Sequence, residues 1–210
     1  FARYWLHNGM LTFDGRKMSK SLGNVLVLHE LLERQPGEVL RFLLLKAHYR
    51  QPLDWSDAAL RQARATLDGW YGVLRDLVAV PDALPFVPPE FEAALVDDLN
   101  TPEAFAVLAR LADDARRGAT PQAKAALLGA ANLLGLLMQP AEAWFRQGVG
   151  IAFDEAAIQA LVDRRQAAKA ARDFTEADRL RAELLDMGVA IEDTPQGPRW
   201  KTVNSDECAA

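Results

Sequence analysis

Apolar residues recur at intervals of three and four through the middle of the chain, the spacing of a helix that buries one face. A long helix is predicted to begin at Ser56, whose hydroxyl can cap the first turn, and to end before Pro81. Two more are predicted at Thr101-Pro102 and Thr120-Pro121, where a hydroxyl cap precedes a proline at the first helical position. With a helix around Phe91–Leu99, these predict an antiparallel bundle of about four helices. The predicted inward residues include Leu60, Ala63, Leu67, Trp70 or Tyr71, Leu74, Leu77, Phe105, Leu108, Leu111, Ala115, Leu127, Leu128, Ala131, Leu134 and Met138.

The pattern changes after Gly150. Helices are predicted from Asp154 to about Ala171 and from Thr175 to Met187. Apolar and polar residues then alternate on both sides of a turn-forming stretch, which predicts a β-hairpin. We therefore expect a small α/β unit, two helices plus a β-hairpin, over residues 151–203, followed by a disordered tail at 204–210.

The first 55 residues mix shorter elements. An extended segment leads to a turn at Asp14-Gly15, helical spacing appears near Leu28–Leu32 and again at Val39–Lys46, and residues 47–55 are predicted to be irregular. Four prolines between residues 81 and 89 favour an extended linker between packed units. The predicted fold class is mainly α, with a helical bundle at its centre.

The formal net charge of −5 argues against a protein that holds nucleic acid by a broad basic surface. The charge is uneven, because residues 1–56 carry +3 whereas residues 57–150 and 151–210 carry −4 each. Any RNA contact in the C-terminal part would have to be local. No run of eighteen apolar residues predicts a membrane span, and the single cysteine, Cys208, agrees with a cytoplasmic location.

Two lysines and two serines cluster in the positive segment, as Lys17-Met18-Ser19-Lys20-Ser21 followed by Leu22-Gly23-Asn24. Ammonium groups three residues apart can bracket a polyphosphate, the hydroxyls add donors, and the glycine lets the backbone fold over a ligand. Two lysines alone would also fit an ordinary exposed basic loop. The complete string is much more specific.

That string resembles the K-M-S-K-S signature of class I aminoacyl-tRNA synthetases. Three flanking segments narrow the resemblance to the cysteinyl-tRNA synthetase family: Tyr4–Met10, His48-Tyr49-Arg50, and the string E-D-T-P-Q-G-P-R-W at Glu192–Trp200. The resemblance runs from about Phe1 to about Lys201. It implies three regions: an edge of a catalytic domain at 1–55, a DALR-type helical bundle at 56–147, and an anticodon-binding unit at 151–203.

The resemblance implies that the loop clamps ATP while cysteine is activated as cysteinyl-adenylate, with ATP and magnesium as substrates. Lys20 matches the lysine that contacts ATP in the family, Lys17 supports it, and Ser19 and Ser21 shape the loop. The expected ATP-binding residues are Lys17, Met18, Ser19, Lys20 and Ser21. Lysines are already charged at neutral pH, so they would stabilise the phosphoryl transition state rather than transfer protons. Lys17 and Lys20 are thus the expected catalytic residues.

The resemblance also implies recognition of the tRNA(Cys) anticodon, by Arg165, Lys169, Asp178, Asp193 and Trp200. Arginine, lysine and aspartate can bond phosphates or base edges, and an indole can stack on a base. Each residue has a plainer alternative. Arg165 and Lys169 fit a solvated helix face, Asp178 fits a helix cap, and Trp200 fits a core position.

Two family features have no match in the sequence: an H-I-G-H motif, and the ligands of the zinc ion that the cysteine enzymes hold. His7, His29 and His48 are isolated from one another in sequence and the only cysteine is Cys208, so no metal site is predicted. We therefore expect the C-terminal portion of a longer monomeric enzyme, inactive by itself. The alternatives are a non-catalytic tRNA-binding module and a related ligase that joins cysteine to an amino-sugar.

Overall fold

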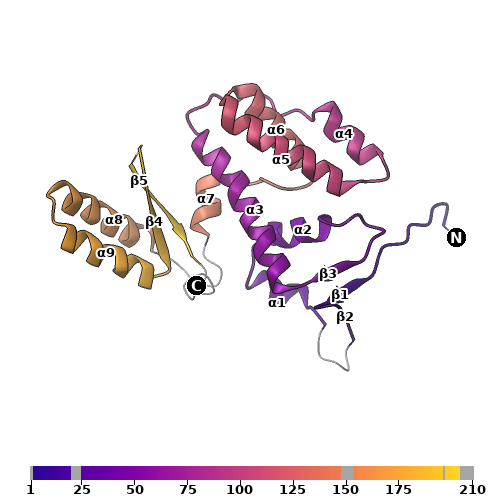
Figure 1. Cartoon of the computed structure of the whole chain (residues 1–210), viewed down its shortest axis with the longest axis horizontal. Helices are drawn as coiled ribbons and strands as arrows, with labels where there is room; N and C mark the ends of the chain where they lie inside the picture. Colours follow the sequence, from indigo (N-terminus) through magenta and orange to yellow (C-terminus); the bar gives the residue numbers. More distant parts are fainter. Residues whose placement is uncertain (1, 20–24, 148–153, 196, 204–210) are drawn as a thin grey trace. The chain divides into compact units, whose positions relative to one another are not determined.

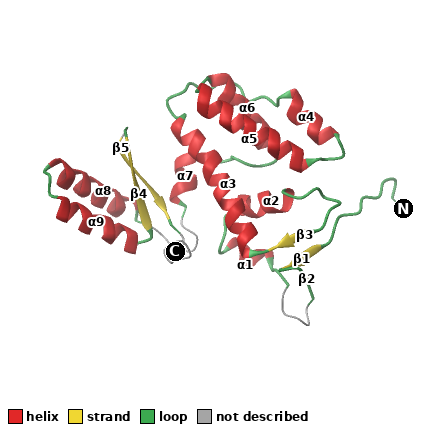
Figure 2. Ribbon diagram, viewed as in Figure 1, coloured by secondary structure: helices red, strands yellow, loops and turns green. Residues whose placement is uncertain are grey.

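The computed structural model describes residues 2–19, 25–147, 154–195 and 197–203. The chain divides into two compact units, residues 1–141 and 142–210 (Figure 1). The described part is mainly helical, with one small sheet in the first unit and a hairpin in the second (Figure 2). This confirms the predicted fold class. None of the described helices is both long and apolar enough to cross a membrane.

The first unit opens with a three-stranded sheet in the order β2-β1-β3. β1 (Leu11–Phe13) and β2 (Arg16–Lys17) form an antiparallel hairpin, whereas β3 (Leu53–Trp55) pairs parallel to β1. In the sequence, two helices lie between β2 and β3, α1 (Leu28–Leu32) and α2 (Gly37–Leu45). The prediction that residues 47–55 are irregular is therefore wrong for the last three residues, which form β3. Three residues beside Pro52 are too short to show alternation, and their partner strand lies about forty residues away.

Four helices make up the predicted bundle: α3 (Asp57–Asp76), α4 (Pro89–Val96), α5 (Thr101–Gly118) and α6 (Pro121–Leu133). α5 packs against each of the other three, and α2 packs on α3. Phe42, Trp70 and Phe105 meet where α2, α3 and α5 converge, with ring centroids 4.7 to 6.2 Å apart. The segment before residue 56 thus shares a core with the bundle. Both Trp70 and Tyr71, which the sequence left as alternatives, are buried.

The helix starts show where cap prediction succeeds and fails. Ser56 and Thr120 accept from the backbone N–H groups of Ala59 and Ala123, as predicted. At α5 the cap is Asn100, whose side chain accepts from the N–H of Glu103. The prediction of Thr101 was wrong by one residue, because the Thr101 hydroxyl instead donates to the carbonyl of Ala47. Met138, predicted to face inward, is exposed because α6 ends at Leu133.

The proline-rich segment at residues 81–88 forms neither helix nor strand, and it joins helices within one compact unit rather than linking two packed units. Its Phe86 N–H donates to the carbonyl of Ala125, and a Cβ on Gly129 of α6 would overlap the Phe86 carbonyl. Lys124 holds the other end, with its ammonium 3.1 Å from the carbonyl oxygen of Val80 and 2.7 Å from Asp82. The segment is a strap bound along α6 rather than a free spacer.

A half-buried carboxylate, Glu38, ties α2 to the turn that follows α6. Its Oε2 accepts from the Tyr71 hydroxyl at 2.8 Å, and its Oε1 accepts from the Leu137 N–H at 2.6 Å. Burial raises the pKa of Glu38, although these hydrogen bonds oppose the shift. Burial and the negative charge of Glu38 also raise the pKa of Tyr71.

The second unit contains most of α7 (Ala141–Arg146), then α8 (Glu155–Ala170), α9 (Phe174–Asp186) and a hairpin of β4 (Val189–Thr194) and β5 (Gly197–Thr202). α8 and α9 lie side by side and α9 packs on β4 (Figure 2). Asp154 caps α8 as predicted. α9 begins one residue earlier than predicted because the Asp173 carboxylate accepts from the N–H of Glu176, and Asp178 is therefore not the cap.

Candidate functional site

The predicted ATP loop follows a tightly fixed turn. Asp14 and Gly15 both adopt positive φ angles, 48° and 71°, so the β1–β2 turn uses the glycine where an ordinary side chain would be strained. Asp54 on β3 accepts from the Thr12 hydroxyl at 2.6 Å and from the Gly15 N–H at 2.8 Å. The Thr12 bond, followed by the Gly15 bond, lowers the pKa of Asp54. This carboxylate therefore fixes the turn that leads to the loop.

The described part of the loop begins on β2. Lys17 is exposed at the end of that strand, and Met18 and Ser19 are half-buried. Lys20 and Ser21 lie outside the described residues. The ATP-binding assignment of these five residues therefore stays a prediction, and the structure describes the hairpin from which the loop starts.

The side chains of His48, Tyr49 and Arg50 all approach the carboxylate of Asp98, in the turn between α4 and α5. The Tyr49 hydroxyl donates to Asp98 Oδ1 at 2.8 Å, and Arg50 Nε lies 3.0 Å from Asp98 Oδ2. These contacts, with the Tyr49 bond the largest, lower the pKa of Asp98. The Tyr49 carbonyl also accepts from the Gly9 N–H at 2.7 Å. Tyr49 thus joins the segment that precedes β1 to the turn between α4 and α5.

In the second unit, the predicted anticodon residues gather at one end of α8. Ile158, Val162 and Arg165 occupy successive positions on the buried face of α8, and Lys169 follows one turn later. Both terminal nitrogens of Arg165 bond Asp193 on β4, each at 3.0 Å, and Lys169 Nζ lies 2.9 Å from the same carboxylate. The core stripe of the helix therefore ends in an ion cluster.

The three charged side chains of the cluster differ in their exposure to solvent. The Arg165 side chain is only 7% exposed, whereas those of Asp193 and Lys169 are 47% and 39% exposed. The hydrogen bonds from Arg165 and then Lys169 hold the pKa of Asp193 well below its usual range, and the Asp193 bond raises that of Arg165. Asp178 on α9 is exposed and also acts electrostatically on Arg165. Four of the five predicted residues are thus brought together.

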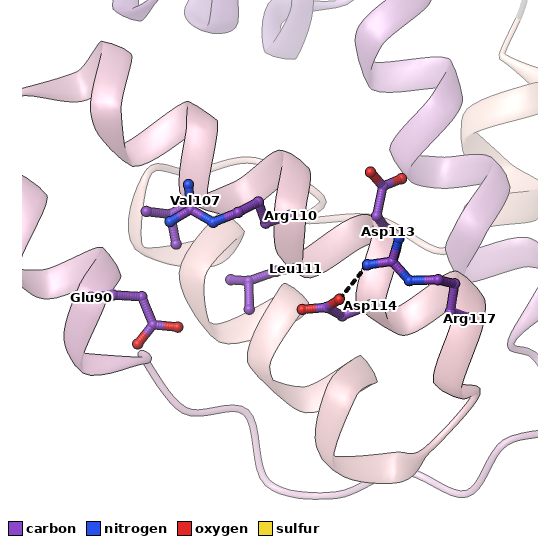
Figure 3. Close-up of a pocket in the computed structure, with 7 residues that line it drawn as sticks. All are labelled: Glu90, Val107, Arg110, Leu111, Asp113, Asp114 and Arg117. Carbon is purple, nitrogen blue, oxygen red and sulfur yellow. Dashed lines mark hydrogen bonds and ion pairs between the residues drawn. The ribbon is translucent and has the colours of Figure 1, made fainter.

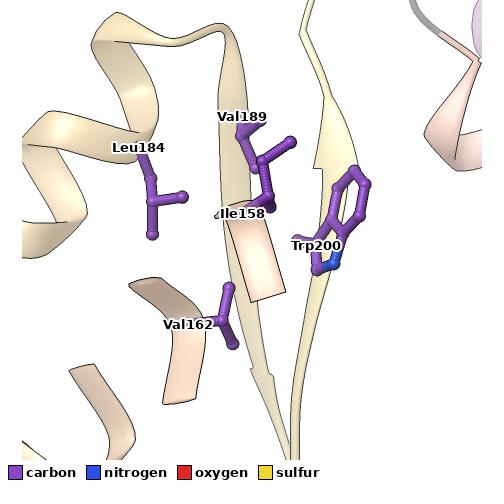
Figure 4. Close-up of a cluster of buried hydrophobic side chains, with 5 residues drawn as sticks. All are labelled: Ile158, Val162, Leu184, Val189 and Trp200. Atoms are coloured by element: carbon purple, nitrogen blue, oxygen red, sulfur yellow. The ribbon is translucent and has the colours of Figure 1, made fainter. Parts of the chain in front are cut away.

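Trp200 is separate from that cluster. It is 3% exposed and packs with Ile158, Val162, Leu184 and Val189 in the core of the unit (Figure 4). The Arg146 guanidinium carbon lies 5.0 Å from the centroid of the Trp200 ring. This is the core position that the sequence offered as the plainer alternative. In this conformation its ring is covered, so stacking on a base would require movement.

A groove of about 330 Å³ lies on the bundle between α4 and α5 (Figure 3). Glu90 stands on one side, and Val107, Leu111 and four charged residues of α5 line the other. Two of the α5 arginines are paired one turn away, Arg117 with Asp114 and Arg116 with Asp113. The groove contains none of the predicted site residues.

Sequence reasoning missed three carboxylates that organise these regions: Glu38, Asp54 and Asp98. The partners of Asp54 and Asp98 lie about forty or more residues away, so no local pattern could reveal them. Within residues 2–19, 25–147, 154–195 and 197–203, no three His, Cys, Asp or Glu side chains are grouped to hold a metal ion. The described residues therefore do not fit the zinc site that the family resemblance implies for the whole enzyme.

Comparison with known protein families accounts for these regions in order. A model described as the class I (C) tRNA synthetase catalytic domain matches residues 1–65, a DALR domain model matches 90–140, and a cysteinyl-tRNA ligase anticodon-binding domain model matches 155–200. The chain belongs to the cysteine–tRNA ligase family. The predicted resemblance to cysteinyl-tRNA synthetases is confirmed.

Individual relatives agree. The chain is 57% identical over 205 residues to a cysteine–tRNA ligase of Xanthomonas campestris, covering 96% of this chain and 44% of the relative. It is 54% identical over 214 residues to one from Xylella fastidiosa, covering 95% and 45% respectively. A third, from Parvibaculum lavamentivorans, is 53% identical over 214 residues, covering 97% and 45%. The chain thus spans less than half the length of the cysteine–tRNA ligases it matches.

Proposed function

We propose that the chain is the C-terminal part of an enzyme that joins cysteine to tRNA(Cys), and that it supplies the ATP-contacting loop and a tRNA-reading unit. The ordered match of catalytic, DALR and anticodon-binding models along one chain is the observation that supports this. We infer domain limits of 1–55, 56–147 and 151–203. A cytoplasmic location and a monomeric state complete the proposal.

The reaction explains why lysines belong in the loop. The cysteine carboxylate attacks the α-phosphate of magnesium-bound ATP, which forms cysteinyl-adenylate and releases pyrophosphate. A terminal ribose hydroxyl of the tRNA then attacks the carbonyl of the adenylate, and AMP leaves. In the first step negative charge accumulates on the phosphoryl oxygens, where the ammonium groups of Lys20 and Lys17 would stabilise it. The turn fixed by Asp54 supports this role for Lys17, because it limits where that side chain can reach.

The first test is ATP–pyrophosphate exchange with cysteine. We expect none from the chain alone, because it covers under half of its relatives and its described residues do not fit the zinc site. Exchange should appear when the preceding portion of the Xanthomonas relative is joined to Phe1. In that protein Lys20→Ala should lower the exchange rate by about 100-fold, the usual effect of losing one transition-state donor. Lys201→Ala, in the other unit, is the control, and equal losses from both variants would contradict the assignment.

For the RNA-reading unit, the ion cluster divides the predicted roles. Both terminal nitrogens of Arg165 are committed to Asp193, which suits a positioning role. Lys169 is more exposed and has ammonium donors beyond the one that Asp193 accepts, so it can reach a phosphate or a base acceptor. The exposed carboxylate of Asp178 can accept from a base amine. Trp200 would then shape the unit from within its core rather than stack on RNA.

The second test is binding of tRNA(Cys) transcripts to the intact chain at two salt concentrations. An anticodon-mutated transcript should bind at least tenfold more weakly than the cognate one. Lys169→Ala should weaken binding while leaving thermal stability nearly unchanged. Equal affinity for both transcripts would defeat anticodon reading. The anticodon-domain match at residues 155–200 favours this function over an amino-sugar ligase, and exchange by the joined protein would exclude the non-catalytic module.

A further inference from the structure

The small sheet of the first unit has two unlike faces. Residues that lie directly opposite each other on paired strands point to the same face of a sheet. Thr12 of β1 lies opposite both Lys17 of β2 and Asp54 of β3, so one polar row crosses the three strands (Figure 1). The neighbouring row, which includes Phe13 and the buried Trp55, points to the other face. Lys17, at the start of the predicted ATP loop, therefore shares a face with Asp54, and Thr12 lies between them.

Asp54 binds the β1–β2 hairpin at two points. Its Oδ1 accepts from the Thr12 hydroxyl at 2.6 Å and from the Gly15 N–H at 2.8 Å. A third hydrogen bond joins β3 to the same turn, because the Asp14 N–H donates to the Trp55 carbonyl at 3.0 Å. Asp14 and Gly15 both have positive φ, a conformation that is costly at Asp14 and persists only where its surroundings hold it. β3 therefore holds the turn of the hairpin as well as its first strand.

The type and the exposure of Asp54 indicate that it serves local geometry more than global stability. Aspartate is depleted in strands, yet Asp54 occupies the middle of β3. Its side chain is exposed, and hydrogen bonds that compete with water add little to the free energy of folding. What accounts for this residue is the turn that it holds in place.

Lys17 depends on this support for its position. β2 is two residues long, and both of them pair with β1. So short a pairing is marginal by itself, so the turn sets its register. An ammonium group stabilises the phosphoryl transition state only from a defined position, and a displacement of about 1 Å can lower a rate by about 100-fold. Support for the turn is therefore support for the placement of Lys17.

We propose that Asp54 is a positioning residue for the formation of cysteinyl-adenylate. It holds Thr12 and the β1–β2 turn, and through them it sets where Lys17 enters the ATP loop. The inference rests on the proposed function for the reaction that Lys17 serves. In this role Asp54 acts only through Lys17, so its loss should lower the maximal rate of activation more than it raises the KM for ATP.

The structural half of the experiment uses the intact chain. Asp54→Ala should speed amide hydrogen exchange at Gly15 by about tenfold, because that N–H loses its acceptor. Thr12→Val removes the other bond and should disturb the turn less, since the Gly15 bond remains. Asp57→Ala is the matched control, because Asp57 is an exposed aspartate at the start of α3. Equal exchange at Gly15 in the Asp54 and Asp57 variants would overturn the inference.

The kinetic half uses the protein in which the preceding portion of the Xanthomonas relative is joined to Phe1, with each variant shown to be folded by its cooperative unfolding. Asp54→Ala should lower the maximal rate of ATP–pyrophosphate exchange about tenfold and change the KM for ATP less than about twofold. Asp54→Asn keeps an acceptor oxygen and should restore most of that rate. Asp57→Ala should change neither quantity. A raised KM with an unchanged maximal rate would overturn the inference.

A double variant decides whether Asp54 acts through Lys17. In a Lys17→Ala background, Asp54→Ala should lower the remaining rate less than about twofold, because the group that it positions is gone. A purely structural role would lower the rate by the same factor in both backgrounds. Equal factors would therefore overturn this inference and leave the proposed function standing. Absence of exchange in the unsubstituted joined protein would overturn both.

Discussion

Glu38 in the first unit and Asp193 in the second each link separate elements, and these two carboxylates are stabilised in opposite ways. Glu38 in the first unit is half-buried and accepts from neutral donors, a tyrosine hydroxyl and a backbone N–H. Asp193 in the second unit is nearer to solvent and accepts from an arginine and a lysine. Burial raises the pKa of Glu38, whereas the hydrogen bonds from Arg165 and Lys169 lower that of Asp193.

The difference shows what each carboxylate can do. Glu38 is half-buried and accepts from two buried residues, one of which, Leu137, lies about a hundred positions away in sequence. Asp193 stands at the end of a core stripe where one of its cationic partners remains accessible. A ligand can therefore compete with Asp193 for Lys169, but it has little access to the buried partners of Glu38.

The largest effect should come from Glu38→Ala. This change removes the carboxylate that accepts from both the Tyr71 hydroxyl and the Leu137 N–H, and a hydrogen bond to a charged group contributes about 1.5–3 kcal/mol. We expect a loss of about 2–4 kcal/mol in the unfolding free energy of the first unit, measured by denaturant titration with residue-resolved hydrogen exchange. Glu38→Gln retains an acceptor and should cost less. A change below about 0.5 kcal/mol for Glu38→Ala would show that this tie is not structural.

A smaller effect is expected from Arg165→Ala in the second unit. The change removes a buried bidentate partner, but Asp193 keeps Lys169 and access to water. We expect a loss of about 1–3 kcal/mol, because the carboxylate left behind is not fully desolvated. Lys169→Ala is the matched control, and as a partly exposed pair it should cost no more than about 0.5 kcal/mol. If the two variants cost the same, the asymmetry inferred for the cluster is wrong.

The smallest effect, and the sharpest contrast, is the pH dependence. The pKa of Asp193 is lower in the folded state, so its contribution is present above the unfolded value near 3.8 and is lost as pH falls below it. The pKa of Glu38 is higher in the folded state, so its contribution is present below 4.5 and declines as pH rises through the folded value. Hydrogen exchange from pH 3 to 7 should therefore show opposite slopes in the two units. Asp193→Asn and Glu38→Gln should each remove only its own slope, and parallel slopes in both variants would contradict the comparison.

Much of the fold could be predicted because helix periodicity and caps are local. Ser56, Thr120 and Asp154 all cap where the sequence indicates. The cap of α5 was misplaced because Asp98 and Leu99 both adopt positive φ, which shifts the turn in a way that residue types alone do not specify. β3 was missed because its pairing with β1 is entirely long-range.

The site was predicted unevenly for a related reason. The family motifs indicated the residues of the ion cluster in the second unit. They did not indicate that Arg165 and Asp193 bond each other across 28 positions of the sequence. One signal was present, because Arg165 continues the spacing set by Ile158 and Val162 and so lies on the buried face. The same spacing argues against a fully solvated helix face. Nothing local marked Asp54 or Asp98, since their partners come from other elements.

The strap at residues 81–88 bears on how such proteins can be recombined. It lies outside all three matched family models, between the catalytic-domain match that ends at residue 65 and the DALR match that begins at residue 90. Yet its Phe86 backbone lies so close to Gly129 that any larger residue there would collide with it. A chimaera cut at the model boundaries would exchange the helices while keeping a foreign strap. Such chimaeras should tolerate module exchange only when residues 81–88 and position 129 are inherited from the same parent.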